Sequence, residues 1–479
     1  RAADGRLWRD DPSLPLASSI ETIEQISKQT GLSPELRDLS AALWFESEQH
    51  NPNWPLVEQM ALQLLAAIPE DELASRLLSD ARQQLMLQAR YRTIAQRRTA
   101  GVSYTEIALA LESLERTWPG FPDPESLQTW VAEERRTARL KPALEQLRER
   151  QGAHAALDMI ERFLEEHPND ADAAQITAEI AEMVGAPFEQ RLRAAQMAGQ
   201  IGDPRCPTSI AQWRTSVLER SYLFGRPNGY WCYIPSGTYC LGEEASRVEI
   251  VLPAFWIARY PVTVAQYREF ICDGGYDEER WWGPEGWAAR QAGLIGARPW
   301  GWDAPRYSQP NQPLIGVSWD EALAFCTWLS QRLRPMLTSY QVHLPSEAMW
   351  EVAARYGDDQ QPRSYPWGEQ EPTIDLAVHM TRPRQLRDDA PGPVGCCVAG
   401  AAACGALDMA GNIWELMASS WESYPHTSEP PAAEEYIAWR GGAWALGAAA
   451  LRATNRDRTR RHGHNYAYGG FRIVITPRV

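Results

Sequence analysis

The side chains best suited to chemistry in this chain of 479 residues are its thiols, its imidazoles and a few carboxylates. Seven of the eight cysteines follow residue 230, yet no CxxC pair occurs. Cys396 and Cys397 are adjacent, which suits neither a zinc site nor an ordinary disulfide. We therefore expect buried free thiols in a protein of the reducing cytoplasm.

Imidazole chemistry is concentrated at the C-terminal end. His462 and His464 are separated by one residue, so the pair could bind one metal ion, or each could hydrogen-bond to a ligand and confer pH sensitivity. His50, His154 and His167 in the first half have no close histidine neighbour, and we assign them surface or capping roles.

Candidate acids and bases occur without forming a recognisable catalytic constellation. All of them lie inside segments where helix capping and buried polar bonds account for a carboxylate. They are Asp320, Glu347, Glu351, Asp408 and Glu415.

Composition narrows the classes of partner. The net charge of −15 argues against a general binder of nucleic acid or anionic membranes. No apolar run approaches the roughly 18 residues of a membrane helix. The first residue is not Met and no apolar signal-peptide core follows it, so we expect that an upstream part is missing.

The elements that position these side chains differ between the two halves. Residues 1–200 read as helices; for example Leu73, Leu77, Ala81, Leu85 and Ala89 recur on one helical face. The helices around 157–164 and 173–180, joined by a His-Pro-Asn-Asp turn, resemble one tetratricopeptide-like hairpin. The stretch GQIGDPRCPT (199–208) breaks the helical periodicity, and residues 201–225 are predicted to be a linker.

From residue 226 the chain changes to short strands, turns and isolated helices, an irregular α+β pattern. Seven collinear segments carry a family resemblance. They are YIPSGTYCLG (233–242), FWIARYPVT (255–263), PLIGVSWD (313–320), LPSEAMWE (344–351), YPWGE (365–369), LDMAGNIWE (407–415), and RGG (440–442) with GFR (470–472). The segment 226–479 resembles the formylglycine-generating-enzyme (sulfatase-modifying-factor) family, whose fold is a variant of the C-type lectin fold.

That resemblance implies metal chemistry that this sequence does not match. Family enzymes bind copper through two cysteines, five residues apart, after Arg-Gly-Gly; the corresponding positions here are Leu446 and Leu451. The related sulfoxide synthases join this domain to a helical bundle and bind iron through three histidines, and no such close set stands in the helical half. We therefore predict no enzymatic activity and no cofactor.

The sequence leaves open whether the domain binds one structural ion, calcium. Asn412 and Glu415, within GNIWE, match family positions that help bind calcium, and oxygen ligands suit this ion. The alternative is a simple role in a turn and a cap.

Toward the end of the chain, a set of short motifs, which we call the frame, alternates with residues that follow no amphipathic pattern. The frame is Arg-Gly-Gly-x-Trp, Leu-Arg-Ala (451–453), Asn-Arg (455–456), Arg458 and Gly-Phe-Arg. This arrangement resembles the variable proteins of diversity-generating retroelements, so 444–471 is interpreted as a variable region. Its predicted ligand-binding positions are Trp444, Ala445, Leu446, Gly447, Ala449, Ala450, Asp457, Thr459, His462, His464, Asn465, Tyr466, Ala467 and Tyr468.

We therefore predict a non-catalytic protein that binds a protein target through its C-terminal surface, with Arg458, Arg460 and Arg461 available to an acidic patch. The helical half is expected to contact an unknown partner, and neither nucleic acid nor membrane is expected. Two alternatives stay open. One is a metal-dependent oxidase or sulfoxide synthase, and the other is the sensor arm of a larger bacterial signalling or conflict protein.

Overall fold

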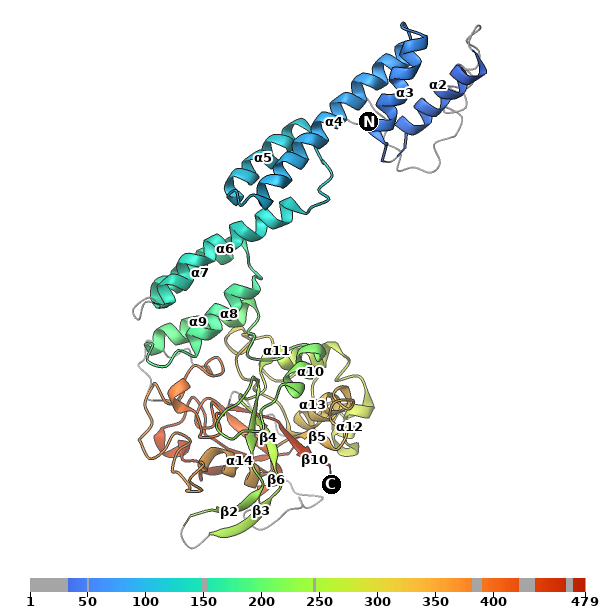
Figure 1. Cartoon of the computed structure of the whole chain (residues 1–479). Helices are drawn as coiled ribbons and strands as arrows, with labels where there is room; N and C mark the ends of the chain where they lie inside the picture. The colour runs from blue at the N-terminus through green and yellow to red at the C-terminus, as the bar shows by residue number, and fades with distance from the viewer. Residues whose placement is uncertain are drawn as a thin grey trace. The chain divides into compact units, whose positions relative to one another are not determined.

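The computed structural model describes residues 33–49, 51–148, 153–243, 247–380, 390–421, 436–461 and 468–478. The chain divides into two compact units, Arg1–Arg139 and Leu140–Val479 (Figure 1). None of the helices in the described ranges combines the length and the apolar character that a membrane span requires.

The described part of the first unit is helical, as predicted for this part of the chain. It contains α2 (Pro34–Ser47), α3 (Trp54–Ala67), α4 (Glu72–Thr99), α5 (Tyr104–Thr117) and the first part of α6 (Leu127–Arg148). The first four begin at polar caps, such as Asp71, whose carboxylate accepts the backbone N–H of Ala74 at 2.8 Å.

Helix α4 contacts different neighbours along its length. Leu77 and Ala81 are buried against α2 and α3, whereas Leu87 and Tyr91 are buried against α5. The predicted stripe therefore holds only at its beginning, and Ala89 is exposed, because the buried face rotates where the packing partner changes.

The second unit combines helices with short strands, which confirms the predicted α+β class. Its helices are α7 (Ala153–Glu166), α8 (Ala171–Ala181), α9 (Phe188–Ile201), α10 (Ile210–Leu218), α11 (Val264–Cys272), α12 (Pro284–Gln291), α13 (Trp319–Arg332) and α14 (Glu347–Arg355). Short 3₁₀ helices are η2 (Glu279–Trp281), η3 (Pro305–Tyr307), η5 (Val398–Gly400) and η7 (Ala448–Leu451).

Three sheets organise the mixed part of this unit. Antiparallel strands β1 (Trp231–Ile234), β4 (Phe255–Ala258), β10 (Val474–Pro477) and β5 (Tyr340–His343) form one sheet in that order. Strands β8 (Arg456–Arg460), β7 (Tyr436–Arg440), β6 (Trp414–Ser420) and β9 (Gly469–Gly470) form another, with β8 and β9 at its two edges. Strands β2 (Gly237–Leu241) and β3 (Val248–Leu252) form a separate hairpin.

Helices α8 and α9 belong to the same unit as the sheets (Figure 1). Residues of these helices share a hydrophobic core with Val378, Cys396 and Cys397. The Arg191 side chain on α9 donates to the Cys396 carbonyl at 3.3 Å and to the Asp375 carboxylate at 2.8 Å. The boundary predicted near residue 200 thus falls inside a continuous core, which no local feature of the chain indicates.

Candidate functional site

Two buried arginines account for the Arg-Gly-Gly and Gly-Phe-Arg motifs. Arg440 has no exposed surface and pairs with Glu347 and Glu351, each at 2.7 Å. Arg472, equally buried, pairs with both carboxylate oxygens of Glu415 at 2.8 and 2.7 Å. Each charge is matched and hydrogen-bonded, as buried charges require. These residues therefore fix the backbone on both sides of the predicted variable region.

The loop that follows Arg440 is held through its backbone. Gly441 and Gly442 have φ angles of 102° and 77°, in the left-handed region that favours glycine. The Trp444 N–H donates to the Asn412 carbonyl at 2.9 Å, and the Leu446 carbonyl accepts from the Met380 N–H at 3.0 Å. The path of the loop is therefore fixed partly by backbone hydrogen bonds, which do not depend on its side chains.

The side chains of this loop separate into buried and accessible ones. Leu451 and Ala453 of the predicted frame are fully buried. The intervening residues are half-buried or exposed, and we call them, with Tyr468, the loop face: Trp444, Ala445, Leu446, Gly447, Ala449, Ala450 and Tyr468. The rings of Trp444 and Tyr468 have centroids 5.6 Å apart at 34°, and Tyr468 is 43% exposed. An aromatic surface is thereby presented beside small residues.

Other predicted ligand-binding positions lie elsewhere or outside the described residues. Asp457 and Thr459 are on β8, at the sheet edge opposite to β9, which follows Tyr468. Three strand spacings separate the two edges, roughly 14 Å. Asp457 and Thr459 therefore lie at the other edge of this sheet from Tyr468. His462, His464, Asn465, Tyr466 and Ala467 lie outside the described residues.

The predicted calcium ligands are already occupied by protein groups. Both oxygens of Glu415 accept from Arg472, and one also accepts from the Trp350 indole N–H at 2.8 Å. The Asn412 amide exchanges two hydrogen bonds with the backbone of Gly392, at 3.0 and 3.2 Å. The Glu415 and Asn412 side chains, engaged in this way, do not fit a calcium site. Their contacts favour the alternative role in a turn and a cap.

Redox-metal ligands of the two family types are not assembled by the described residues. Leu446 and Leu451 stand where the resemblance places copper thiolates, and Leu451 is fully buried. Across the described ranges no three His, Cys, Asp or Glu side chains are grouped as metal ligands. His154 is exposed beside Asp158, His167 lies against Phe163, and His50 is outside the described residues.

Asp408, four residues before Asn412, is the most unusual carboxyl group near the loop. Burial raises its pKa to about 6, although its hydrogen bond from the Gly395 N–H, at 2.7 Å, and the charge of Arg472 act in the opposite direction. Its φ of 55° is one that Asp tolerates better than most residues. Asp408 and Asn412 thus hold the 391–395 segment from one side.

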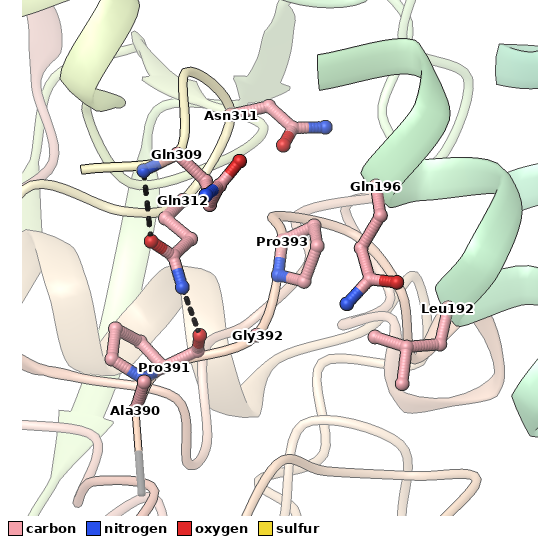
Figure 2. A pocket seen from close by; sticks show the side chains of 9 residues that line it. All are labelled: Leu192, Gln196, Gln309, Asn311, Gln312, Ala390, Pro391, Gly392 and Pro393. Atoms are coloured by element: carbon pink, nitrogen blue, oxygen red, sulfur yellow. Dashed lines mark hydrogen bonds between the residues drawn. The ribbon is translucent and has the colours of Figure 1, made fainter. Parts of the chain in front are cut away.

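Figure 2 shows the other side of that segment, where a cavity separates it from α9. The Gln312 side chain accepts from the Gln309 N–H at 3.1 Å and donates to the Pro391 carbonyl at 2.8 Å. The cavity volume is about 30 Å³, which suits water and not a substrate. Sequence reasoning missed this junction, because its lining comes from three segments that are far apart in the chain, 192–196, 309–312 and 390–393.

A second aromatic pair next to the loop was also missed. Tyr365 and Trp367 stack with centroids 5.3 Å apart at 1°, and they share a small core with Leu451 and Ala450. Trp367 is half-buried. The YPWGE segment contains both rings, but nothing in its sequence indicates that it lies beside the C-terminal loop.

Comparison with known proteins gives consistent family matches. Residues 226–477 match the family described as the sulfatase-modifying factor enzyme 1-like domain. Hercynine oxygenase from Mycolicibacterium thermoresistibile is 36% identical over 242 residues, covering 46% of this chain and 50% of that protein. The formylglycine-generating enzyme from Thermomonospora curvata is 30% identical over 249 residues, covering 42% and 74%. The chain thus spans about half the length of the hercynine oxygenases that it matches.

Among solved structures, Treponema denticola variable protein 1 is similar over 52% of this chain and 95% of its own, with 19% identity and a TM-score of 0.38. No argument rests on a score this low. The prediction that this chain is not an enzyme is wrong, because its relatives are named as an oxygenase and a formylglycine-generating enzyme. The missing copper cysteines exclude one ligand set and do not exclude enzymatic activity.

Proposed function

This chain belongs to the sulfatase-modifying factor enzyme 1-like family, with a C-type-lectin-like domain over residues 226–477, and from this premise we propose that the domain binds a polypeptide ligand through the loop face. The observation that carries the proposal is the separation of a buried frame from an accessible set of side chains on a loop held by its backbone.

Backbone anchoring supports a recognition role, because it removes the usual cost of ordering a loop on binding. The Asn455 amide donates to the Ala450 carbonyl at 3.0 Å, and the anchors at Asn412 and Met380 hold the other end. None of these bonds uses a side chain of the loop face. The described bonds that hold the loop therefore do not depend on the identity of residues such as Ala445 and Ala449.

The residue types favour a polypeptide as ligand. Trp444 and Tyr468 provide a rigid aromatic surface with few rotatable bonds, the type of group that dominates protein recognition. Ala445, Gly447 and Ala449 leave room beside these rings for side chains of a partner. Aromatic anchors next to small residues are typical of antibody-like binding surfaces.

The proposal is tested by selecting a displayed library of random peptides on the full-length protein. Peptides enriched on the wild type are expected to bind a Tyr468→Ala variant at least tenfold more weakly, the loss expected when an aromatic anchor worth about 1.4 kcal/mol is removed. Leu294→Ala is the matched control, because Leu294 is 60% exposed but belongs to another part of the domain. Equal binding to both variants would remove the loop face from consideration.

We also propose that the accessible positions vary naturally while the frame does not. The backbone anchoring supports this, since substitutions at Ala445 or Ala449 leave every described bond of the loop intact. Deep sequencing of codons 440–472 in the native population is expected to show substitutions at the predicted ligand-binding positions and none at Arg440, Gly442 or Arg472. Uniform conservation across the segment would refute natural diversification.

A second candidate function is oxidation of a small substrate by a metal-dependent enzyme. The names of the relatives favour it, since three of them, at 34 to 36% identity, are hercynine oxygenases. The described residues do not supply the metal ligands of such an enzyme. Oxygen consumption by the full chain with hercynine, a thiol and Fe(II), above that of free Fe(II), would establish this activity. Consumption equal to the background would reject it for that substrate.

A further inference from the structure

We propose that the cavity between strand β2 and the end of helix α14 binds a lysine side chain of a partner polypeptide. Phe224, Ile234, Pro235 and Tyr239 line the cavity from one part of the chain, and residues within 352–360 line it from another. All of them belong to the described ranges, and none belongs to the loop face. The site therefore goes beyond the function proposed for that face.

The size of the cavity suits one side chain. Its volume is about 70 Å³, compared with about 30 Å³ for the cavity beside α9. This volume accommodates roughly five water molecules, so the ammonium of one lysine and its outer methylene groups fit it. Pockets for whole small molecules are larger, on the order of 300 Å³ or more.

Aromatic rings make up much of the wall. The rings of Tyr239 and Tyr356 have centroids 5.2 Å apart at 74°, so they form a corner, and the Phe224 ring also lines the cavity. Tyr239 and Tyr356 are both nearly fully buried. Aromatic rings attract cations through their electron-rich faces, most strongly where water is excluded. The wall is therefore suited to the end of a lysine side chain.

Both tyrosine rings are fixed before a ligand arrives. The Tyr239 hydroxyl donates to the Pro235 carbonyl at 2.7 Å. The Tyr356 hydroxyl accepts the Cys240 N–H at 3.0 Å and donates to the Cys240 carbonyl. Because the hydroxyls already have backbone partners, a ligand does not have to order these rings, and little side-chain entropy is lost on binding.

Negative charge at the mouth of the cavity identifies the sign of the ligand. The Asp358 side chain lines the cavity and is exposed to solvent. Its carboxylate is available to accept hydrogen bonds from an ammonium group that enters between the rings. The chain as a whole carries a net charge of −15, which attracts a cationic ligand and repels an anionic one.

The surroundings of the cavity favour a lysine within a polypeptide over a free amine. Tyr222 and Leu223, which directly precede Phe224, are each 60% exposed. They present apolar surface to the residues that flank the lysine. Lysine is favoured over arginine, because its compact ammonium needs one acceptor, whereas a planar guanidinium is best matched by a two-pronged one.

The experiment measures fluorescence polarisation of a labelled peptide, with one Lys among Leu and Ser residues, as the full chain is added. The comparison peptide has norleucine in place of Lys, which keeps the methylene groups and removes the ammonium. We expect the norleucine peptide to bind about tenfold more weakly, and binding of the Lys peptide to weaken as salt concentration rises. Phe224→Leu, which removes one ring at a half-buried position, should reduce the difference between the two peptides.

Asp358→Asn should weaken binding of the Lys peptide about threefold and leave binding of the norleucine peptide unchanged. Asp277→Asn is the matched control, because it removes the same charge from another exposed aspartate. Neither peptide should bind differently to this variant, or to Tyr468→Ala, which separates this site from the loop face.

Three results would overturn the proposal. Equal affinities for the Lys and norleucine peptides would show that the ammonium is not recognised. Equal losses in the Asp358 and Asp277 variants would reduce the effect to net charge. If n-butylammonium alone bound as tightly as the Lys peptide, the ligand would be a free amine and not a polypeptide.

Discussion

At the scale of single residues, the motifs of this family are explained by buried charge. Arg472 satisfies its guanidinium with Glu415 and with backbone carbonyls such as that of Leu407, at 2.8 Å. Arg440 does the same with Glu347 and Glu351. Only a planar fork with five donors reaches all these acceptors at once. The residue types could therefore be recognised in the sequence, whereas the partners could not.

Arg472→Lys tests this explanation. A lysine ammonium cannot replace the two parallel bonds to Glu415, so a buried carboxylate loses partners, and we expect a loss of about 3–5 kcal/mol in the free energy of unfolding. Urea denaturation followed by tryptophan fluorescence measures it. Arg458→Lys, an exposed counterpart, should change stability by less than about 0.5 kcal/mol. Similar losses in both variants would contradict the assigned role.

Asp408 gives a prediction about pH. Its folded pKa of about 6 lies above the ordinary value of 3.8, so the folded state binds a proton more tightly than the unfolded state. Its contribution to stability is therefore present below about pH 4 and is lost as pH rises through 6. Asp408→Asn should remove this loss and raise stability at pH 7 by about 1–3 kcal/mol, since Asn keeps an acceptor for Gly395.

Asp203 supplies a control of opposite sign. Burial raises its pKa, but the charge and hydrogen bonds of Arg205 outweigh burial, and the net shift is downward. Its contribution is therefore present above the ordinary pKa and lost as pH falls. Thermal melts across pH 4 to 8 should show Asp203→Asn losing stability at neutral pH while Asp408→Asn gains it. A gain in both, or in neither, would reject these assignments.

At the scale of elements, the loop from Gly441 to Leu451 contains positions that hold the backbone and exposed positions that form the proposed binding surface. A Cβ on Gly442 would lie 2.7 Å from the Ala450 carbonyl oxygen, and φ there is positive. Gly442→Ala should therefore cost about 1–3 kcal/mol. Ala449→Ser, on an exposed position seven residues later, should leave the unfolding midpoint unchanged. Equal effects in denaturation experiments would show that the loop is not held as described.

Sequence periodicity predicted the type of each element better than it predicted which other elements that element packs against. The α4 stripe was correct at Leu77 and Ala81 and failed at Ala89, because the helix changes packing partner along its length. The predicted ligand-binding positions fall at both edges of one sheet, because strand order places Asp457 and Thr459 at the edge opposite to Tyr468. Strand order depends on pairing between distant segments, which local pattern does not encode.

At the scale of the whole molecule, the C-terminal unit is larger than the family match. The match begins at residue 226, whereas the compact unit begins at Leu140. Helix α9 explains the difference: Arg191 bonds the Cys396 carbonyl, and the Asn311 amide donates to the Ala195 carbonyl at 2.6 Å. The helices before 226 are therefore needed to cover the 390–397 segment.

A fragment of residues 226–479 should consequently be less stable than one of residues 140–479. Removing α7 to α10 exposes Val378, Cys396 and Cys397, which share a buried core with α7 to α9. We expect the shorter fragment to melt roughly 2 °C or more lower, as a loss of more than 1 kcal/mol implies for a domain of this size. Calorimetry of the two fragments measures this, and identical melting temperatures would refute the shared core.

Photo-crosslinking of a selected peptide ligand tests the loop face most directly. A benzophenone amino acid is placed at Ala449 in one protein, at Asp457 in a second and at Leu109 in a third, all of them exposed positions. We expect covalent capture of the peptide from position 449 and not from 109, with 457 reporting whether β8 is contacted instead. Capture from 457 alone, or equally from all three, would contradict the assignment of the ligand to the loop face.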